Sequence, residues 1–295
     1  MINLKKCTYC KYEKNNHFLE SKDYSTSKEI FNIVKCEKCN LLYTNPRPKE
    51  KDIGKYYLSE NYISHTNETK GIFNFMYHTV RKYAIYSKTK LLAQNSIIGK
   101  HLDIGSGTGE FLNACKKRGY KCLGIEPSNI ARENSEHNFD LDISEDTDLQ
   151  HLKKNAFDSI SMWHVLEHVY DLDDTVKNLS RIINKNGTLI VAVPNHMSFD
   201  AKFYKKFWAA WDLPIHLNHF NVETITKIFE ENNFDLKKKK GMIFDSFYVS
   251  LLSNQYKSGR KQYLKGFLIG LISNISAFFK LSEYSSTIYI FKSRK

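Results

Sequence analysis

The sequence predicts an α/β protein whose main part is a doubly wound, mostly parallel sheet with helices on both faces, preceded by a small cysteine-containing knuckle. From residue 100 onward, short apolar runs alternate with amphipathic helical patterns, which is typical of a parallel sheet built from βαβ units. Within the first forty residues, four of the six cysteines form two C-x2-C pairs. The 295 residues, 41% of them hydrophobic, suffice for one large domain with a small appendage.

The knuckle is predicted from Cys7, Cys10, Cys36 and Cys39. Each C-x2-C pair can hold a metal ion from a tight turn, and four thiolates complete the tetrahedral coordination of zinc. The gap between the pairs is longer than usual, and a β-hairpin can fill it. Because four thiolates leave no open coordination position, we interpret the site as structural zinc in a zinc-ribbon-like knuckle. A redox pair is the alternative, but the βαβ context typical of such pairs is missing.

A break follows the knuckle, because Pro46 and Pro48 interrupt the chain. Residues 71–96 then carry apolar side chains at helical spacing, which predicts a helix leading into the main domain. The expected domains are a zinc-binding knuckle at 1–48, a helical linker or lid at 49–98 and the main α/β domain at 99–295.

Apolar runs and helix signals give the order of elements in the main domain. The expected strands are Lys100–Ile104, Lys121–Ile125, 140–143, 157–162 and 188–193. Apolar spacing predicts a helix after the first strand, Ser128 can cap a second helix, and residues 171–183 form a third, amphipathic helix.

The last third of the chain begins with a predicted turn and becomes less regular. Asn186 and Gly187 predict that turn directly before the fifth strand. Toward the C-terminus, the expected helices are 222–231, 247–252 and 267–279, and the expected strands are 236–242 and 287–292.

The loop after the first strand contains Gly105, Gly107 and Gly109. Ligands of open α/β sheets bind at the carboxyl ends of the strands, where the strand order reverses. A dinucleotide would need the spacing G-x-G-x-x-G, whereas the spacing here is G-x-G-x-G, and Glu110 at the helix start would repel a pyrophosphate. Asp103, just before the first glycine, suits a ligand that carries an ammonium group.

S-adenosylmethionine has both required properties, because it lacks phosphate and carries an amino group beside its sulfonium cation. Glu126 ends the second strand, where a carboxylate can accept hydrogen bonds from both ribose hydroxyls. An acid, a glycine loop and a second acid therefore converge on one ligand. This combination predicts S-adenosylmethionine as the cofactor.

The segments DIGSGTG, GIEPS, FDSISMWHVLEHV and GTLIVAVPN resemble the class I S-adenosylmethionine-dependent methyltransferase family over residues 70–235. The segments CTYC, CEKCNLLYTNPRP and KYY resemble a zinc-binding module that precedes such domains in some sugar methyltransferases. The resemblance implies a Rossmann-like, seven-stranded sheet with a reversed last strand, for which 287–292 is the candidate. It assigns cofactor contacts to Asp103, Gly105, Gly107, Gly109, Glu126, Trp163 and His164.

Methyl transfer to oxygen also needs a general base, and the pKa of histidine suits that role. The candidates are His168, after the fourth strand, and His216 and His219 in the segment PIHLNHF. For His168, support of a helix start is the alternative. Some quinone and small-RNA methyltransferases carry E-x-x-E-H here as a magnesium site, but His164 replaces the first glutamate in this chain. The loss of a hard oxygen ligand disfavours magnesium.

The expected acceptor is a small molecule with a hydroxyl group, such as a sugar, a quinone or a lipid-linked compound. Phe207, Trp208 and Trp211 suggest an aromatic lid over this acceptor, unless these rings simply pack on the sheet. Residues 266–279 are apolar, too short to span a bilayer and preceded by basic residues. We interpret them as a core-packed helix, with an interfacial helix in peripheral membrane contact as the alternative.

The formal net charge is +12, but the lysines are dispersed, so we interpret them as a solvated surface. A nucleic-acid methyltransferase is the alternative function, disfavoured because no N/D-P-P-Y/F-like motif follows the fourth strand. A non-catalytic cofactor-binding module is a further alternative. The sequence start lacks an apolar secretory region, and no apolar run reaches the ~18 residues of a membrane span, so we expect a cytoplasmic protein. We expect a monomer or homodimer.

Overall fold

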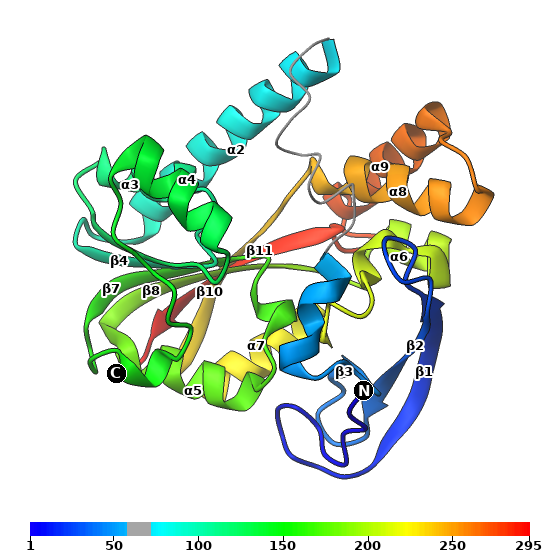
Figure 1. Ribbon diagram of the computed structural model, residues 1–295, viewed down its shortest axis with the longest axis horizontal. Coiled ribbons are helices and arrows are strands. Elements are labelled where there is room, and N and C mark those ends of the chain that lie inside the picture. The colour runs from blue at the N-terminus through cyan, green and yellow to red at the C-terminus, as the bar shows by residue number, and fades with distance from the viewer. Residues whose placement is uncertain (58–71) are drawn as a thin grey trace.

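The computed structural model describes residues 1–57 and 72–295. Its main feature is a seven-stranded sheet with the strand order β10-β11-β8-β7-β4-β5-β6 (Figure 1). Five neighbouring strands pair in parallel, whereas β11 pairs antiparallel with both β8 and β10. The predicted doubly wound sheet and its reversed last strand are confirmed. The strands are β4 (Lys100–Ile104), β5 (Lys121–Ile125), β6 (Ile143–Ser144), β7 (Phe157–Trp163), β8 (Ile183–Pro194), β10 (Phe234–Gly241) and β11 (Ser286–Ser293).

Helices cover both faces of this sheet. On one face lie α2 (Ile72–Asn95), α3 (Glu110–Lys116) and α4 (Asn129–Phe139), and on the other lie α5 (Leu172–Ile182) and α7 (Val222–Glu230) (Figure 1). The ends of these helices follow from local capping, since the side chain of Ser128 accepts a hydrogen bond from the Ala131 amide at the start of α4. The helix α5 buries the apolar stripe that its sequence predicted.

The strand order reverses at β4, because β5 lies on one side of it and β7 on the other. In sheets of this kind the loops at the carboxyl ends of the strands surround the ligand at the reversal point. The loops that follow β4, β5, β7 and β8 therefore open at one edge of the sheet. These loops contain almost all of the residues that the sequence singled out for the cofactor and the base.

A second, antiparallel sheet contains the N-terminal residues. It has the order β1 (Asn15–Lys22), β2 (Ile30–Cys36), β3 (Leu42–Thr44) and β9 (Asn218–His219), and the helical turn η1 (Glu50–Tyr57) follows it. The β1–β2 hairpin fills the gap between the two cysteine pairs, as expected. The strand β9 comes from the C-terminal half, where Leu42 pairs with His219 and Tyr43 with Asn218. The division of the chain at residues 48 and 98 stays a prediction, and residues 58–71 of the linker lie outside the described residues.

Two strand predictions need correction. The predicted turn at Asn186 and Gly187 is wrong, because β8 continues through both residues as a bulged strand. Asn186 has the left-handed φ of 58°, and the pairing of β8 with β7 shifts register there, so that the chain absorbs the extra residues without reversing. The third strand lies slightly later than expected and is only two residues long, at the edge of the sheet.

The aromatic segment before β9 packs in the interior. Trp208 and Trp211 are buried in a cluster with α6 (Phe199–Tyr204), so their rings contribute to the core rather than to a lid. Trp208 donates a hydrogen bond from Nε1 to the carboxylate of the buried Asp200 (2.7 Å). In the part of the chain that the structure describes, the other 3-10 turns are η3 (Leu149–His151), η4 (Leu166–His168), η5 (Lys205–Phe207) and η6 (Ala209–Trp211).

The helices α8 (Asp245–Ser258) and α9 (Tyr263–Phe278) form a hairpin at one end of the sheet (Figure 1). The preferred interpretation of residues 266–279 as a core-packed helix is wrong, because most of the surface of this helix is exposed. Only Gly266, Ile269, Gly270, Ser273 and Ala277 of α9 are buried, while its larger apolar side chains are exposed. The reason is that the small residues face α8, which leaves the large ones on the outside. Within residues 1–57 and 72–295, no helix combines the length and the apolar character that crossing a membrane requires.

Candidate functional site

The glycine loop lies between β4 and α3, at the point where the strand order reverses. Gly105, Gly107 and Gly109 have φ angles of +73°, +54° and +81°, which side chains with a Cβ atom rarely adopt. A Cβ atom at Gly105 or Gly109 would also collide with neighbouring side chains, for example at 2.0 Å from the Ser135 hydroxyl for Gly109. At Gly107, among the described residues other than its chain neighbours, no atom lies within 4 Å of such a Cβ. The middle of the loop therefore presents bare backbone to open space.

Glu126 follows β5 and lies beside this loop. Its carboxylate accepts hydrogen bonds from the backbone amides of Gly107 (2.8 Å) and Ser128 (2.9 Å). These two bonds fix the carboxylate at the tip of the sheet and leave lone pairs on both oxygens for further donors. The arrangement places an acceptor of ribose hydroxyls next to the open face of the glycine loop.

Asp103 is buried under the loop, where the Ser161 hydroxyl donates a hydrogen bond to it (2.5 Å). Burial raises the pKa of this carboxyl to about 7, against the opposing effects of Ser161 and the Lys88 ammonium. Lys88 comes from α2, and its Nζ lies 4.5 Å from the centroid of the Trp163 ring. Sequence reasoning missed Lys88, because a lysine in a predicted helix gives no short-range sign that it will lie beside Trp163 and Asp103.

The two residues predicted to flank the cofactor after β7 have different surroundings. Trp163 is buried between the sheet and α3, with its ring 5.3 Å from that of Phe111. His164 has a left-handed φ of 59°, and its imidazole lies 3.2 Å from carboxylate oxygens of both Glu167 and Asp245. Burial opposes protonation of His164, but these two carboxylates raise its pKa to about 10. His164 is therefore a cation at neutral pH, which makes it unsuited to act as a base.

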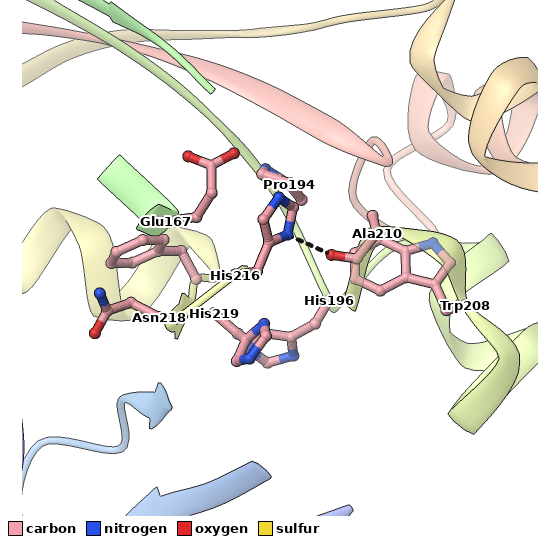
Figure 2. A pocket seen from close by; sticks show the side chains of 9 residues that line it. Glu167, Pro194, His196, Trp208, Ala210, His216, Asn218 and His219 are labelled. Atoms are coloured by element: carbon pink, nitrogen blue, oxygen red, sulfur yellow. Dashed lines mark hydrogen bonds between the residues drawn. The ribbon is translucent and has the colours of Figure 1, made fainter. Parts of the chain in front are cut away.

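Two histidines that are far apart in the sequence, His168 and His216, lie in contact with each other. The rings of His168, in η4, and His216 are 4.7 Å apart and nearly perpendicular. The Nδ1 of His168 donates to the carbonyl of Ile215 (3.0 Å). The Nδ1 of His216 donates to the carbonyl of Ala210 (2.9 Å), as Figure 2 shows. A carbonyl can only accept, so each Nδ1 carries the proton and each Nε2 keeps its lone pair. A carboxylate oxygen of Asp212 lies 3.9 Å from the Nε2 of His216.

The electrostatics keep both histidines neutral. Burial, reinforced by the neighbouring His216, lowers the pKa of His168 to about 4, and burial likewise lowers the pKa of His216. His168 is only half-buried, whereas His216 is buried behind it. The hydroxyl of Tyr57, from the KYY segment, lies 3.2 Å from Nδ1 of His168. His168 is thus the more accessible of two neutral imidazoles.

A small cavity adjoins His216 (Figure 2). Glu167 is buried there, and its Oε2 has no hydrogen-bond partner among the described residues. Glu167, His168 and His216 bring one carboxylate oxygen and two imidazole nitrogens within 4.8 Å of one another, close enough to share a metal ion. This set contains a single hard oxygen ligand, which agrees poorly with magnesium. The cavity is lined by Glu167, Pro194, His196, Trp208, Ala210, His216, Asn218, His219 and Phe220.

His219 is brought into the same cavity but has a different environment. Its Nε2 lies 3.1 Å from the Thr44 hydroxyl, which itself donates to the carbonyl of His216 (2.7 Å). Its ring contacts Trp211 at 5.2 Å, and burial lowers its pKa. The contact between His219 and Thr44 therefore lies within the N-terminal sheet, between β9 and β3, and the predicted role of His219 as a base has less geometric support than that of His168.

The four N-terminal cysteines form one cluster. The sulfurs of Cys7 and Cys39 are 3.6 Å apart, those of Cys10 and Cys36 are 3.5 Å apart, and all four lie within 4.8 Å of one another. Four cysteine sulfurs this close together are the donor set that structural zinc prefers, so the residues fit the metal. The other two cysteines, Cys115 in α3 and Cys122 in β5, lie outside this cluster.

The fold, the glycine loop and the two acids together define a class I S-adenosylmethionine-dependent methyltransferase. Residues 76–239 match a family model described as a methyltransferase domain, which is more than half of the chain. The chain therefore belongs to this family of methyltransferases.

Similar proteins agree with this family. The chain is 28% identical over 172 residues to the ubiquinone biosynthesis O-methyltransferase of Pelagibacter ubique, covering 54% of this chain and 68% of that protein. It is 33% identical over 119 residues to the enzyme of the same name from Coxiella burnetii, where the match covers 38% of this chain and only 50% of the relative. A solved S-adenosylmethionine-dependent methyltransferase from Archaeoglobus fulgidus shares the fold, with a TM-score of 0.50, 17% identity and coverage of 72% and 94% of the two chains.

Proposed function

We propose that this methyltransferase transfers the methyl group of S-adenosylmethionine to a hydroxyl group of a small-molecule acceptor, with His168 as the general base. The observation that carries the proposal is the pair of neutral imidazoles formed by His168, in the segment that follows β7, and His216, in the segment before β9. The segment that follows β7 is the one that matters for the position of the base. That segment belongs to the same edge of the sheet as the glycine loop. The relatives named as ubiquinone biosynthesis O-methyltransferases support a hydroxyl acceptor of this kind.

In this proposal the cofactor lies along the open side of the glycine loop. Glu126 accepts hydrogen bonds from the ribose hydroxyls, and the backbone at Gly107 lies against the nucleoside. Asp103 is the acid nearest to the expected place of the methionine amino group, and the positive charge of that group would lower the pKa of Asp103 from about 7 and favour its ionised form. S-adenosylmethionine, when bound, supplies an electrophilic methyl group on a positively charged sulfur.

The task of the protein is to align the acceptor and remove its proton. Methyl transfer is an in-line displacement, so the acceptor oxygen, the methyl carbon and the sulfur must be collinear. The lone pair on Nε2 of His168 takes the proton of the hydroxyl group as the new C–O bond forms and the C–S bond breaks. His216 supports the ring of His168, and the buried carboxylate of Glu167 stabilises the imidazolium that results.

Replacing Glu126 by alanine should weaken the binding of S-adenosylmethionine by about 1–3 kcal/mol, because the ribose hydroxyls lose a charged acceptor. Isothermal titration calorimetry with the purified full chain measures this loss. Glu133→Ala in the exposed part of α4 is the matched control, since it removes the same charge near the same loop. Equal cofactor affinity in Glu126→Ala and wild type would contradict the proposed ribose contact.

The proposed reaction is tested with S-adenosylmethionine that carries an isotopically labelled methyl group. We expect the label on the oxygen of at least one member of a panel of catechols, hydroquinones and sugar nucleotides, together with stoichiometric S-adenosylhomocysteine. The same acceptors with their hydroxyl groups already methylated should give no transfer. Label that appears only on amines, or only on added RNA or DNA, would contradict a small hydroxyl acceptor.

A further inference from the structure

The helix α9 buries mostly small side chains and exposes large apolar ones, which is the reverse of the usual distribution in a surface helix. The residues that it buries include two glycines, a serine and an alanine, whereas its largest apolar side chains point outward. Leu264 is 73% exposed, Phe278 is 72% exposed, and the next residue, Phe279, is 65% exposed. The other exposed apolar residues in and just after this helix are Tyr263, Phe267, Leu268, Leu271, Ile272, Ile275 and Leu281. A contiguous apolar surface of this kind on a helix marks an interaction site.

The contact between α8 and α9 explains the inversion. A Cβ atom at Gly266 would lie 2.8 Å from Cα of Leu251, and one at Gly270 would lie 2.8 Å from Cα of Phe247. The two backbones therefore approach closely at Gly266 and Gly270, whereas Ser273, further along the same buried side, donates a hydrogen bond to Asp200 of α6. In water, helices usually bury their large apolar residues against each other, whereas helices in contact with lipid place small residues between them and large ones outside.

We propose that the α8–α9 hairpin docks this enzyme on the surface of an anionic lipid bilayer. The apolar surface is bordered by exposed cations, and residues 266–279 contain no charged side chain. At 1.5 Å per residue the 16 residues of α9 extend about 24 Å, so the helix lies in the interface plane with its outer face among the acyl chains. The flanking cations that would face lipid phosphates are Lys257, Arg260, Lys261, Lys265 and Lys280.

The docking surface is connected to the candidate active site. Asp245, the first residue of α8, is the carboxylate that lies 3.2 Å from Nε2 of His164. The preceding residue, Phe244, contacts the ring of Tyr83 in α2 at 5.8 Å. When the hairpin is docked, the sheet edge that contains the candidate active site thus lies next to the bilayer. This position would suit an acceptor that is dissolved in the lipid. This last step rests on the proposed function, whereas the docking itself does not.

Flotation with lipid vesicles tests the docking without cofactor or acceptor. We expect the full-length protein to float with vesicles of phosphatidylcholine and phosphatidylglycerol, and to bind pure phosphatidylcholine vesicles at least tenfold more weakly. The triple variant Leu264→Gln, Leu268→Gln and Ile275→Gln should lose at least tenfold in its partition onto the anionic vesicles. These three side chains are exposed along one face of α9, so their replacement leaves the contact with α8 intact.

The matched control is the triple variant Ile30→Gln, Ile97→Gln and Ile130→Gln, which changes exposed apolar residues elsewhere and should float like wild type. Unchanged affinity of the α9 variant for S-adenosylmethionine shows that it is folded and separates this test from that of the proposed function. Failure of the wild-type protein to float, or equal binding by the α9 variant, would overturn the proposal. A dimer that the α9 variant dissociates, without vesicle binding by wild type, would assign the surface to a second copy of the chain instead.

Discussion

His168→Asn should lower kcat for methyl transfer by about 10²–10⁴-fold, the usual contribution of a general base, while the affinity for S-adenosylmethionine stays unchanged. The amide of asparagine can take the place of the ring Nδ1 and keep the hydrogen bond to the Ile215 carbonyl, so the local structure is preserved. What disappears is the basic Nε2. Because the pKa of wild-type His168 is about 4, its imidazole is already neutral at pH 6, and kcat of the wild type should be flat between pH 6 and 8.

Three comparisons make this experiment specific. His137→Asn, on the exposed surface of α4, should have no effect on kcat. His216→Asn keeps its bond to Ala210 and should lower kcat less than His168→Asn, since His216 only supports the ring of the base. Added imidazole should partly restore the His168→Asn variant. Turnover by His168→Asn within a factor of two of wild type would remove His168 from the mechanism.

Cys36→Ser should abolish stoichiometric zinc binding and strongly destabilise the N-terminal sheet. Removing one of four thiolates leaves an incomplete tetrahedron, and the binding free energy of structural zinc, about 10–16 kcal/mol in small zinc peptides, is also folding free energy. Cys36 is fully buried at the end of β2, so nothing else can compensate for the lost ligand. We expect one zinc per wild-type chain and a clear loss of thermal stability in the variant, measured by metal analysis and calorimetry.

Cys36→Ser should also affect the candidate active site. β3 pairs with β9, and the Thr44 hydroxyl donates to the carbonyl of His216, so loosening of the zinc-bound sheet moves the support of the base. We therefore expect a lower kcat as well as a lower metal content in Cys36→Ser. Cys122→Ser, which changes a half-buried cysteine outside the cluster, should keep its zinc. Full zinc occupancy in Cys36→Ser, or a metal-free wild-type protein, would contradict the four-thiolate site.

Much of the cofactor half of the molecule was predictable, because local patterns determine it. The strands Lys100–Ile104 and Lys121–Ile125 are observed with the predicted bounds, since buried parallel strands appear as short apolar runs between polar residues. The three glycines of the loop adopt conformations that only glycine tolerates well, which explains their spacing. The cysteine cluster was equally predictable, because the short spacing of each C-x2-C pair indicates a tight turn that brings its two sulfurs together.

The half of the site that would hold the acceptor was less predictable. The approach of His168 to His216, and of Asp245 to His164, joins segments that no short-range pattern connects. The assignment of His164 as a cation also depends on two carboxylates that only folding brings to it. Sequence reasoning placed His164 among the cofactor contacts, and that role stays a prediction.

The outer surface of α9 is the clearest example of a feature that could not be predicted from the sequence. Apolar residues occur on every side of a helix over 266–279, so their pattern does not predict which side packs against the rest of the protein. The decision came from the close approach of α8, which admits only small residues such as Gly266 and Gly270.

The sequence by itself determined the class of the fold, the glycine loop and the two cysteine pairs, because each depends on residues close together along the chain. The tertiary structure alone decided which histidine is neutral and accessible, how the N-terminal sheet contacts its neighbour His216 through β3 and β9, and which face of the terminal hairpin remains uncovered. These properties depend on burial and on charges from distant segments, and both arise only when the layers pack together.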